Sequence, residues 1–126
     1  MDDDLHLHLH LHIVIVGPCA AGKSTLRTLL QARGYTQVRV VAQEHSGIRD
    51  LWKLRGYPEV LIYLDTEPET ANARQGRSDW TLAEHLTQVE RLRAARAACN
   101  LYLPTDDLTP NEVADQVDRF VAAHIL

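Results

Sequence analysis

Eight consecutive residues near the start of the chain have side chains and spacing suited to binding phosphate groups. They match the pattern Gly-x-x-x-x-Gly-Lys-[Ser/Thr] and are Gly17, Pro18, Cys19, Ala20, Ala21, Gly22, Lys23 and Ser24. Glycines allow the backbone to curl, so that successive N–H groups point inward at phosphate oxygens. We expect Lys23 to reach the β- and γ-phosphates and the Ser24 hydroxyl to ligate Mg²⁺. The motif therefore predicts a binding loop for a nucleoside triphosphate.

The segments on either side of the motif are the ones that such a loop needs. An apolar, β-branched run at 13–16 precedes it and predicts a buried strand, while apolar residues recur at helical spacing over 26–32. A strand, this loop and a helix, in that order, bring the positive end of a helix to the phosphates. Lys23 and Lys53 are the only lysines in the chain, which argues against a spare surface charge at the motif position.

The rest of the chain alternates between strand and helix patterns. Further strands are predicted at 37–42, 60–64 and 101–103. Helices are predicted at 26–32 with Gly34 as the stop, from Ser46 to 54, from a Thr66/Glu69 capping box to about Arg74, from a Thr81/Glu84 capping box to 99, and from Thr109 onward. The apolar face of the fourth helix is expected to comprise Leu82, Leu86, Val89, Leu92, Ala95 and Cys99, and that of the last helix Val113, Val117, Phe120 and Val121. This alternation predicts an α/β fold, a three-layer α/β/α sandwich with a small parallel sheet of about four strands.

Polar residues that follow the strands are further candidates for a site, because ligands of parallel sheets bind beyond the carboxyl ends of the strands. They are Glu44 and His45, Asp65, and residues 105–107. Glu44 follows a strand expected beside that of the motif, so we interpret it as a ligand of Mg²⁺-bound water or a general base. The alternative is a carboxylate that bonds to nearby backbone. His45 and Trp80 are either acceptor-pocket residues or packing residues.

Three stretches of the chain resemble one family of enzymes. HIVIVGPCAAGKSTL contains the motif, LIYLDTEPETANARQGR is similar to a late strand followed by an arginine-bearing lid, and LYLPTDDLTPNEVADQV is similar to the final strand and helix near the nucleotide base. Their order resembles that of the small P-loop nucleoside and nucleotide kinases, including adenylate-kinase-like enzymes. The resemblance covers about residues 12–124, and only the first stretch is highly specific.

This resemblance implies a role for each matching residue. Lys23 would stabilise the transferring phosphoryl group, Ser24 would hold Mg²⁺, and Thr25 would contact the α-phosphate. Arg74 and Arg77 would lie in a lid that closes over the phosphates, since phosphoryl transfer requires positioned positive charge and excluded water. The other interpretation of this arginine pair is a solvated helix end.

The chain also departs from the family pattern. The family usually has another strand, ending in an acidic residue near Mg²⁺, between the second and third strands expected here. Glu44 or Asp65 has to stand in for that acid, or the acid is absent; Asp65 resembles a position that is more often structural. The leading hypothesis is an ATP-dependent, Mg²⁺-dependent kinase of an unidentified small molecule. The alternatives are a nucleotide-binding switch or ATPase without an acceptor, and a minimal P-loop scaffold.

Composition excludes several other classes of function. The chain has 126 residues and a net charge of −4, which argues against a nucleic-acid-binding surface. No apolar run approaches the roughly 20 residues of a membrane span, and the acidic start at 2–4 has the wrong charge for a secretory signal. The spacing of the two cysteines suggests neither a zinc site nor a disulfide framework. We therefore expect a reduced, cytoplasmic protein, with its oligomeric state left open.

Leucine and histidine alternate over residues 5–12, directly before the first predicted strand. A strand buried on both faces should be uniformly apolar, so we expect the core strand to begin near Leu11 or His12. Residues 1–11 are interpreted as an extension without a catalytic role, in which the histidines could bind a transition metal adventitiously. Residues 12–126 are interpreted as a single domain.

Overall fold

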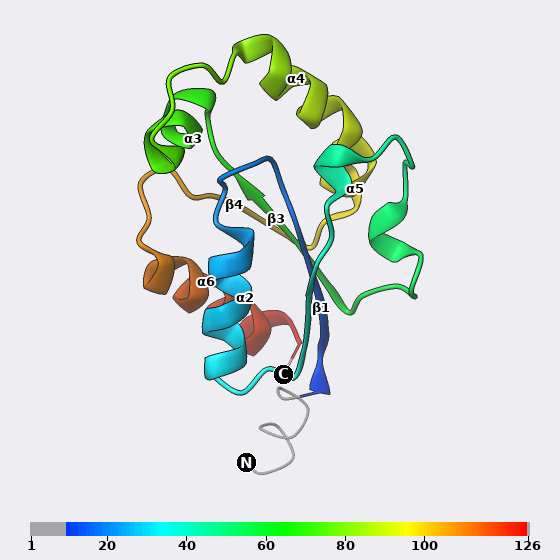
Figure 1. Cartoon of the computed structure of the whole chain (residues 1–126). Helices are drawn as coiled ribbons and strands as arrows, with labels where there is room; N and C mark the ends of the chain where they lie inside the picture. The colour runs from blue at the N-terminus through cyan, green and yellow to red at the C-terminus, as the bar shows by residue number, and fades with distance from the viewer. Residues whose placement is uncertain (1–9, 126) are drawn as a thin grey trace.

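The structure is a computed structural model that describes residues 10–125. At its centre lie four parallel strands in the order β2-β1-β3-β4 (Figure 1). They are β1 (His12–Val16), β2 (Gln37–Val40), β3 (Val60–Asp65) and β4 (Leu101–Pro104). Ile13 of β1 lies opposite both Val38 and Val60, and Ile62 lies opposite Leu101. The parallel sheet predicted from the alternation of strands and helices is thereby confirmed.

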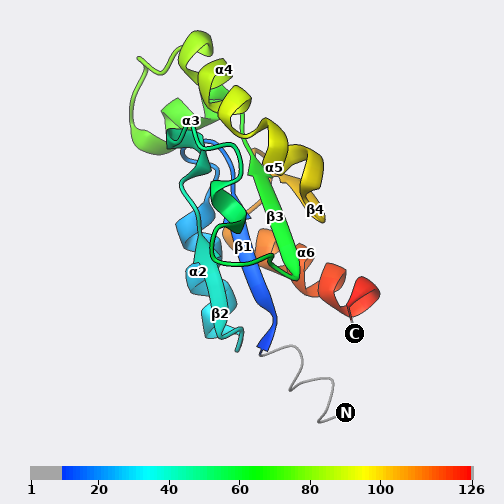
Figure 2. The ribbon, with the colours of Figure 1, turned by 90° about the vertical axis from the view of Figure 1, so that its right-hand side faces the viewer.

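Helices cover both faces of this sheet (Figures 1 and 2). One face packs against α2 (Lys23–Ala32) and α6 (Pro110–His124), and the other packs against α5 (Arg93–Ala98) and the short 3₁₀ helix η2 (Leu51–Lys53). Two further helices, α3 (Pro68–Gln75) and α4 (Leu82–Arg91), lie at the end of the sheet where the strands finish (Figure 1). Within residues 10–125, no helix has both the length and the apolar character needed to cross a membrane.

The central strands are apolar on both faces because each face is covered by helices. Ile13 and Ile15 of β1 belong to the core under α2 and α6, whereas Val14 and Val16 belong to the core under α5. β1 begins at His12, as expected from the change in pattern there. Residues 1–9, including the expected alternation of His6 and His8, lie outside the described residues.

The capping box predicted at Thr81 and Glu84 is confirmed, and the helix predicted from Thr109 begins with a box of the same kind. At α4, the Thr81 hydroxyl accepts a hydrogen bond from the Glu84 N–H, and the Glu84 carboxylate accepts one from the Thr81 N–H. Thr109 and Glu112 make the same pair of bonds at α6. Each box satisfies two N–H groups that a helix start leaves without an intrahelical partner. These local signals were sufficient because they involve residues only three positions apart.

The helix predicted from Ser46 is wrong. The region instead contains two single 3₁₀ turns, η1 (Gln43–His45) just before Ser46 and η2 within the predicted helix, with a bend and a turn between them. The Gln43 side chain prevents a continuous helix, because its amide donates to the Ile48 carbonyl at 2.6 Å and accepts from the Trp52 N–H at 3.1 Å. The segment therefore folds around one buried glutamine.

The capping box predicted at Thr66 and Glu69 is also wrong. α3 begins at Pro68 after Glu67, and Glu67 makes no side-chain cap. The Thr66 hydroxyl donates to Asp106 Oδ1 instead, at 2.9 Å. A contact across the carboxyl ends of β3 and β4 thus replaces the local one.

The apolar face predicted for the helix at 82–99 is wrong in its first half. The chain breaks at Leu92 into α4 and α5, and Leu82 and Leu86 are 63% and 55% exposed. His85 and Gln88 are the buried residues of α4. The physical reason is that α4 packs against polar loops at the end of the sheet, while only α5 packs against the apolar sheet itself.

Candidate functional site

The segment Gly17–Ser24, called the glycine-rich loop from here on, joins β1 to α2. At Gly17, a Cβ atom would lie 2.0 Å from the Leu64 carbonyl oxygen, so only glycine permits this approach to β3. Ala20 and Gly22 have φ angles of 63° and 98°, in the left-handed region. Alternation of left- and right-handed residues turns successive N–H groups toward one side, which forms a concave site for an anion. These angles give the loop a tight curl, in which the Cys19 N–H donates to Gln88 and the Ala21 N–H donates to the Pro18 carbonyl oxygen.

Lys23 lies folded over this loop. Its ammonium donates to the carbonyl oxygens of Gly17 and Pro18, both at 2.8 Å, and forms an ion pair with Glu44 Oε2 at 2.8 Å. These contacts use all three ammonium protons. The Lys23 and Glu44 side chains are only 10% and 5% exposed, so the pair is largely removed from water. The structure therefore brings together two residues that the sequence predicted for the same site.

Glu44 belongs to η1, directly after β2, and its backbone is held against α4. Arg91 donates to the Glu44 carbonyl oxygen at 3.2 Å, and Gln43 donates to the Arg91 carbonyl oxygen at 3.3 Å. The Glu44 Oε2 atom faces Lys23, whereas Oε1 is buried without a hydrogen-bond partner. A buried carboxylate oxygen without a donor is costly. This oxygen is the group in the site that most needs a ligand.

Cys19 lies on the same side of the glycine-rich loop as Glu44. The Gln88 side chain accepts the Cys19 N–H at 2.9 Å and donates to Cys19 Sγ at 3.1 Å, so it holds both ends of this residue. The Nε2 atom of His45 lies 3.5 Å from the same sulfur and 3.8 Å from Glu44 Oε2. Neither cysteine of the chain is in a disulfide. Three side chains that bind cations thus converge beside the loop.

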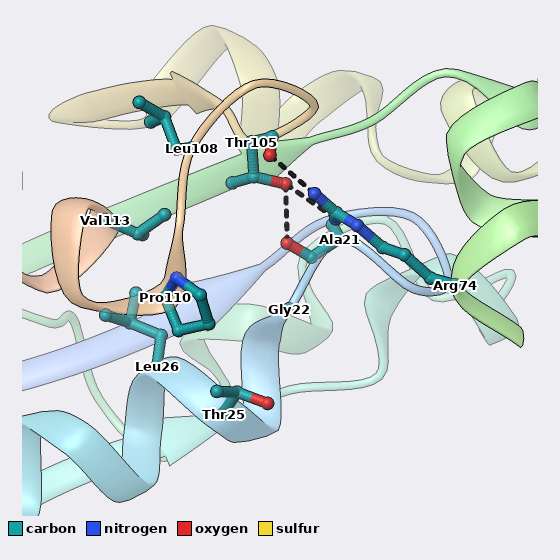
Figure 3. Close-up of a pocket in the computed structure, with 9 residues that line it drawn as sticks. All are labelled: Ala21, Gly22, Thr25, Leu26, Arg74, Thr105, Leu108, Pro110 and Val113. Carbon is teal, nitrogen blue, oxygen red and sulfur yellow. Dashed lines mark hydrogen bonds between the residues drawn. The ribbon is translucent and has the colours of Figure 1, made fainter.

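Arg74 of α3 reaches across to the other side of the loop. Its guanidinium donates to the Ala20 carbonyl oxygen at 2.8 Å. It also donates to the hydroxyl, at 3.0 Å, and to the carbonyl oxygen of Thr105 (Figure 3). The Thr105 hydroxyl in turn lies 2.8 Å from the Ala21 carbonyl oxygen. Arg74 therefore joins three segments: α3, the glycine-rich loop and the turn after β4.

A cavity of about 290 Å³ opens beside these contacts. Figure 3 shows its lining, which comprises Ala21, Gly22, Thr25, Leu26, Arg74, Thr105, Leu108, Pro110 and Val113. Most of this lining is apolar, and Arg74 and Thr105 supply the polar groups on one side. Because the loop and the first turn of α2 form one wall, a ligand in the cavity would be continuous with one bound at the loop.

Asp106 holds the beginning of α3 in place and so helps to position Arg74. It accepts hydrogen bonds from the Thr66 hydroxyl and the Glu67 N–H, each at 2.9 Å. Burial opposes ionisation of this carboxyl, but these bonds and one from the Thr70 hydroxyl outweigh that effect and hold the pKa of Asp106 below its ordinary value. The ionised carboxylate therefore stabilises this corner of the fold.

The other residues predicted for the site differ in whether they can contact a ligand at the glycine-rich loop. Ser24 and Thr25 are exposed in the first turn of α2, so both hydroxyls are accessible to a ligand. Arg77 is exposed and forms a two-bond pair with Asp79, at 2.8 and 3.1 Å. Asp65 accepts from the Thr66 N–H and from the Tyr102 hydroxyl, so both of its oxygens are engaged. The structure thus favours Arg74 over Arg77, and Glu44 over Asp65, as members of one site.

Sequence reasoning missed Gln88 and the apolar wall of the cavity. Gln88 lies within a helix expected to turn leucines inward, and it is separated from Cys19 by 69 positions. The available signal was the spacing of His85 and Gln88, which lie three positions apart and so share a face of the helix that differs from that of the leucines. Leu108 and Pro110 lie between strand and helix patterns, where nothing in the local sequence indicates a binding wall.

No protein-family model and no protein of curated function matches this sequence. The chain is a small α/β domain with a four-stranded parallel sheet in the order β2-β1-β3-β4.

Proposed function

We propose that this chain binds a nucleoside triphosphate together with Mg²⁺ and transfers the γ-phosphoryl group to a small-molecule acceptor. The observation that carries the proposal is the meeting of Lys23 and Glu44 over the glycine-rich loop, at 2.8 Å. Lys23 is the cation that a phosphate group needs. Glu44 can take the place of the acidic residue that small P-loop kinases carry near Mg²⁺ and for which the sequence alone left two candidates.

Phosphate binding would use groups that the free protein holds ready. The N–H groups at the start of α2 have no intrahelical partner, and the positive end of the helix dipole lies with them. Lys23 would exchange the carbonyl oxygens of Gly17 and Pro18 for phosphate oxygens, which carry full negative charge and form stronger hydrogen bonds. The N-terminus of α2 and Lys23 together suit the β- and γ-phosphates.

The residues of the site also fit Mg²⁺, which prefers oxygen ligands. Glu44 offers a buried, unpartnered Oε1, and Ser24 offers an exposed hydroxyl. When bound, the ion would neutralise charge on the phosphates during transfer. The role of Glu44 would be to hold the ion or its water, and that of Lys23 to neutralise phosphate charge. Asp65 suits this role less well because both of its oxygens already accept hydrogen bonds.

We infer that the nucleotide base enters the cavity beside Arg74. A volume of about 290 Å³ with mostly apolar walls suits a flat heteroaromatic ring. Arg74 presents a planar guanidinium, which stacks well on aromatic faces. The leading hypothesis predicts ATP as the nucleotide and therefore adenine as the base in this cavity.

One observation supports the alternative, a nucleotide-binding switch or ATPase without an acceptor. On the Cys19 side of the glycine-rich loop, Gln88 makes hydrogen bonds to both the backbone and the sulfur of Cys19. An acceptor approaching from that side would have to displace α4. The two functions therefore differ in whether α4 moves.

Calorimetric titration with a non-hydrolysable ATP analogue and Mg²⁺ tests nucleotide binding. The wild-type chain should bind, and Arg74→Ala should weaken binding of the analogue more than binding of inorganic tripolyphosphate, because only the former carries a base. Arg77→Ala is the matched control and should leave both affinities unchanged. The absence of a binding isotherm at millimolar analogue would refute the proposal.

A second assay separates the kinase from the alternative. ADP formation is measured with and without a panel of nucleosides, nucleotides and sugars. Stimulation by one acceptor, lost in Lys23→Ala, supports phosphoryl transfer to a small molecule. Turnover that no acceptor changes supports the ATPase or switch.

A further inference from the structure

Cys19, Glu44 and His45 come together although they belong to two separate segments of the chain. Cys19 lies in the glycine-rich loop, and the other two lie in η1 after β2. One potential ligand atom from each residue lies within 4.8 Å of the other two. The strand order explains the encounter, because β1 and β2 are neighbours and their carboxyl ends open onto the same edge.

The separations suit one ion held by all three residues. Zn–S and Zn–N bonds of about 2.3 and 2.0 Å at a tetrahedral angle place sulfur and nitrogen about 3.5 Å apart. The observed distance from Cys19 Sγ to His45 Nε2 is 3.5 Å, and that from His45 Nε2 to Glu44 Oε2 is 3.8 Å. Cys19 and His45 are thus already spaced for one cation, and the Glu44 carboxylate, whose Oε2 stays with Lys23, lies next to them.

The unpartnered Glu44 Oε1 is a second and independent indication of a ligand. The Glu44 side chain is 5% exposed, yet only Oε2 has a partner, which is Lys23. A cation in contact with Oε1 would remove the cost of this buried oxygen without requiring Lys23 to leave. The His45 side chain is 58% exposed and leaves a path for an ion to enter.

Groups around the three residues hold them in place, as the surroundings of metal ligands usually do. Gln88 is buried and donates to Cys19 Sγ, an arrangement that stabilises a thiolate. Arg91 fixes the backbone of Glu44 through its carbonyl oxygen.

We propose that Cys19, Glu44 and His45 form a binding site for a borderline-soft divalent transition metal, with Zn²⁺ as the best match. A thiolate, an imidazole and a carboxylate are a set that Zn²⁺ accepts and Mg²⁺ disfavours. Binding releases the Cys19 thiol proton to solvent. The fourth coordination position is open to water. This site goes beyond the proposed Mg²⁺–nucleotide site and shares with it Glu44 and, through Cys19, the glycine-rich loop.

Titration with Co²⁺ under reducing conditions and without nucleotide tests the site. A thiolate bound to Co²⁺ gives a charge-transfer band in the near ultraviolet, whereas histidines alone do not. This band distinguishes the proposed site from the histidines at positions 6, 8 and 10. A triple variant with asparagine at those positions removes these three imidazoles from the background.

We expect the band to saturate at one Co²⁺ per chain in the wild type, the triple variant and Cys99→Ser. It should be absent in Cys19→Ser, which matches the Cys99→Ser control in chemistry. His45→Asn and Glu44→Gln should each weaken Co²⁺ binding by more than about 100-fold, since even the loss of a surrounding hydrogen bond costs 10- to 100-fold. Circular dichroism verifies that each variant is folded.

Three results would overturn the proposal. They are the absence of a thiolate band in the wild type, a band that disappears with Cys99 rather than Cys19, and undiminished affinity in both His45→Asn and Glu44→Gln. Because no nucleotide is present, failure here is distinguishable from failure of the proposed ATP binding.

Discussion

Replacement of Lys23 by methionine should strongly destabilise the nucleotide-free protein. The ammonium makes two hydrogen bonds to backbone carbonyls and one ion pair, all at 2.8 Å. Methionine fills a similar volume but supplies no donor. The variant would leave the Glu44 carboxylate buried without a cation, and both of its oxygens would lack a strong partner.

The size of the effect follows from the burial of the pair. Each charged hydrogen bond contributes about 1.5–3 kcal/mol, so three would sum to roughly 5–9 kcal/mol. The sum overestimates the loss, because the loop can relax and the desolvation cost of Lys23 is regained. Removing one partner of a buried pair costs about 3–5 kcal/mol, and we expect a value in that range. Since small domains unfold with about 5–15 kcal/mol, the variant should lose a large part of its stability.

Urea unfolding followed by circular dichroism measures the change. With a slope of about 1–3 kcal/mol per molar urea, the midpoint should fall by roughly 1–5 M. Lys53→Met is the matched control, since Lys53 is the only other lysine and its pair with Asp50 is partly exposed, at 3.6 Å. We expect the urea midpoint of Lys53→Met to differ little from that of the wild type.

A double variant separates the loss of the pair from other effects. Glu44→Gln removes the buried charge, so Lys23→Met combined with Glu44→Gln should be more stable than Lys23→Met alone. A Lys23→Met midpoint close to that of Lys53→Met would refute the reasoning. So would a double variant less stable than both single variants.

Three further predictions concern the loop and its support. Gly17→Ala should cost about 3 kcal/mol or more, because its Cβ would lie 2.0 Å from a β3 carbonyl oxygen, while Gly47→Ala, with open space, should change stability little; urea midpoints compare them. Ala20→Gly should raise stability by about 0.5–1 kcal/mol in the same assay by relieving a φ of 63°, and a loss would contradict that strain. Asp106 has a lowered pKa, so its stabilisation is complete above its ordinary value of 3.8 and is lost as the pH falls through the folded value. Asp106→Asn should therefore be less stable than wild type at pH 7, with the difference vanishing in acid; thermal unfolding across pH checks this, and a constant difference would contradict it.

Patterns within a few residues accounted for most of the fold. The apolar run at 13–16 and the glycine-rich motif predicted a strand, a loop and a helix. The capping box at Thr81 and the helix start predicted at Thr109 were both correct. The box at Thr66 failed because Asp106, which lies 40 positions away, competes for the same hydroxyl. Local signals therefore hold where no long-range partner is stronger.

Local sequence patterns did not predict the polar contacts around the glycine-rich loop. The leucines of α4 have the spacing of a buried face, but the helix lies at the end of the sheet and turns Gln88 toward Cys19. Hydrophobic periodicity indicates which residues share a face, and it does not indicate which face meets the rest of the protein.

The sequence by itself determined that a glycine-rich loop followed by a lysine lies between a buried strand and a helix. The reason is that backbone form and helix capping depend on adjacent residues. The tertiary structure decided that Glu44, rather than Asp65, meets Lys23, and that Arg74, rather than Arg77, borders the loop. Those choices depend on the placement of β2 beside β1 and on the packing of α3 and α4 at the end of the sheet, which involve residues far apart in the chain.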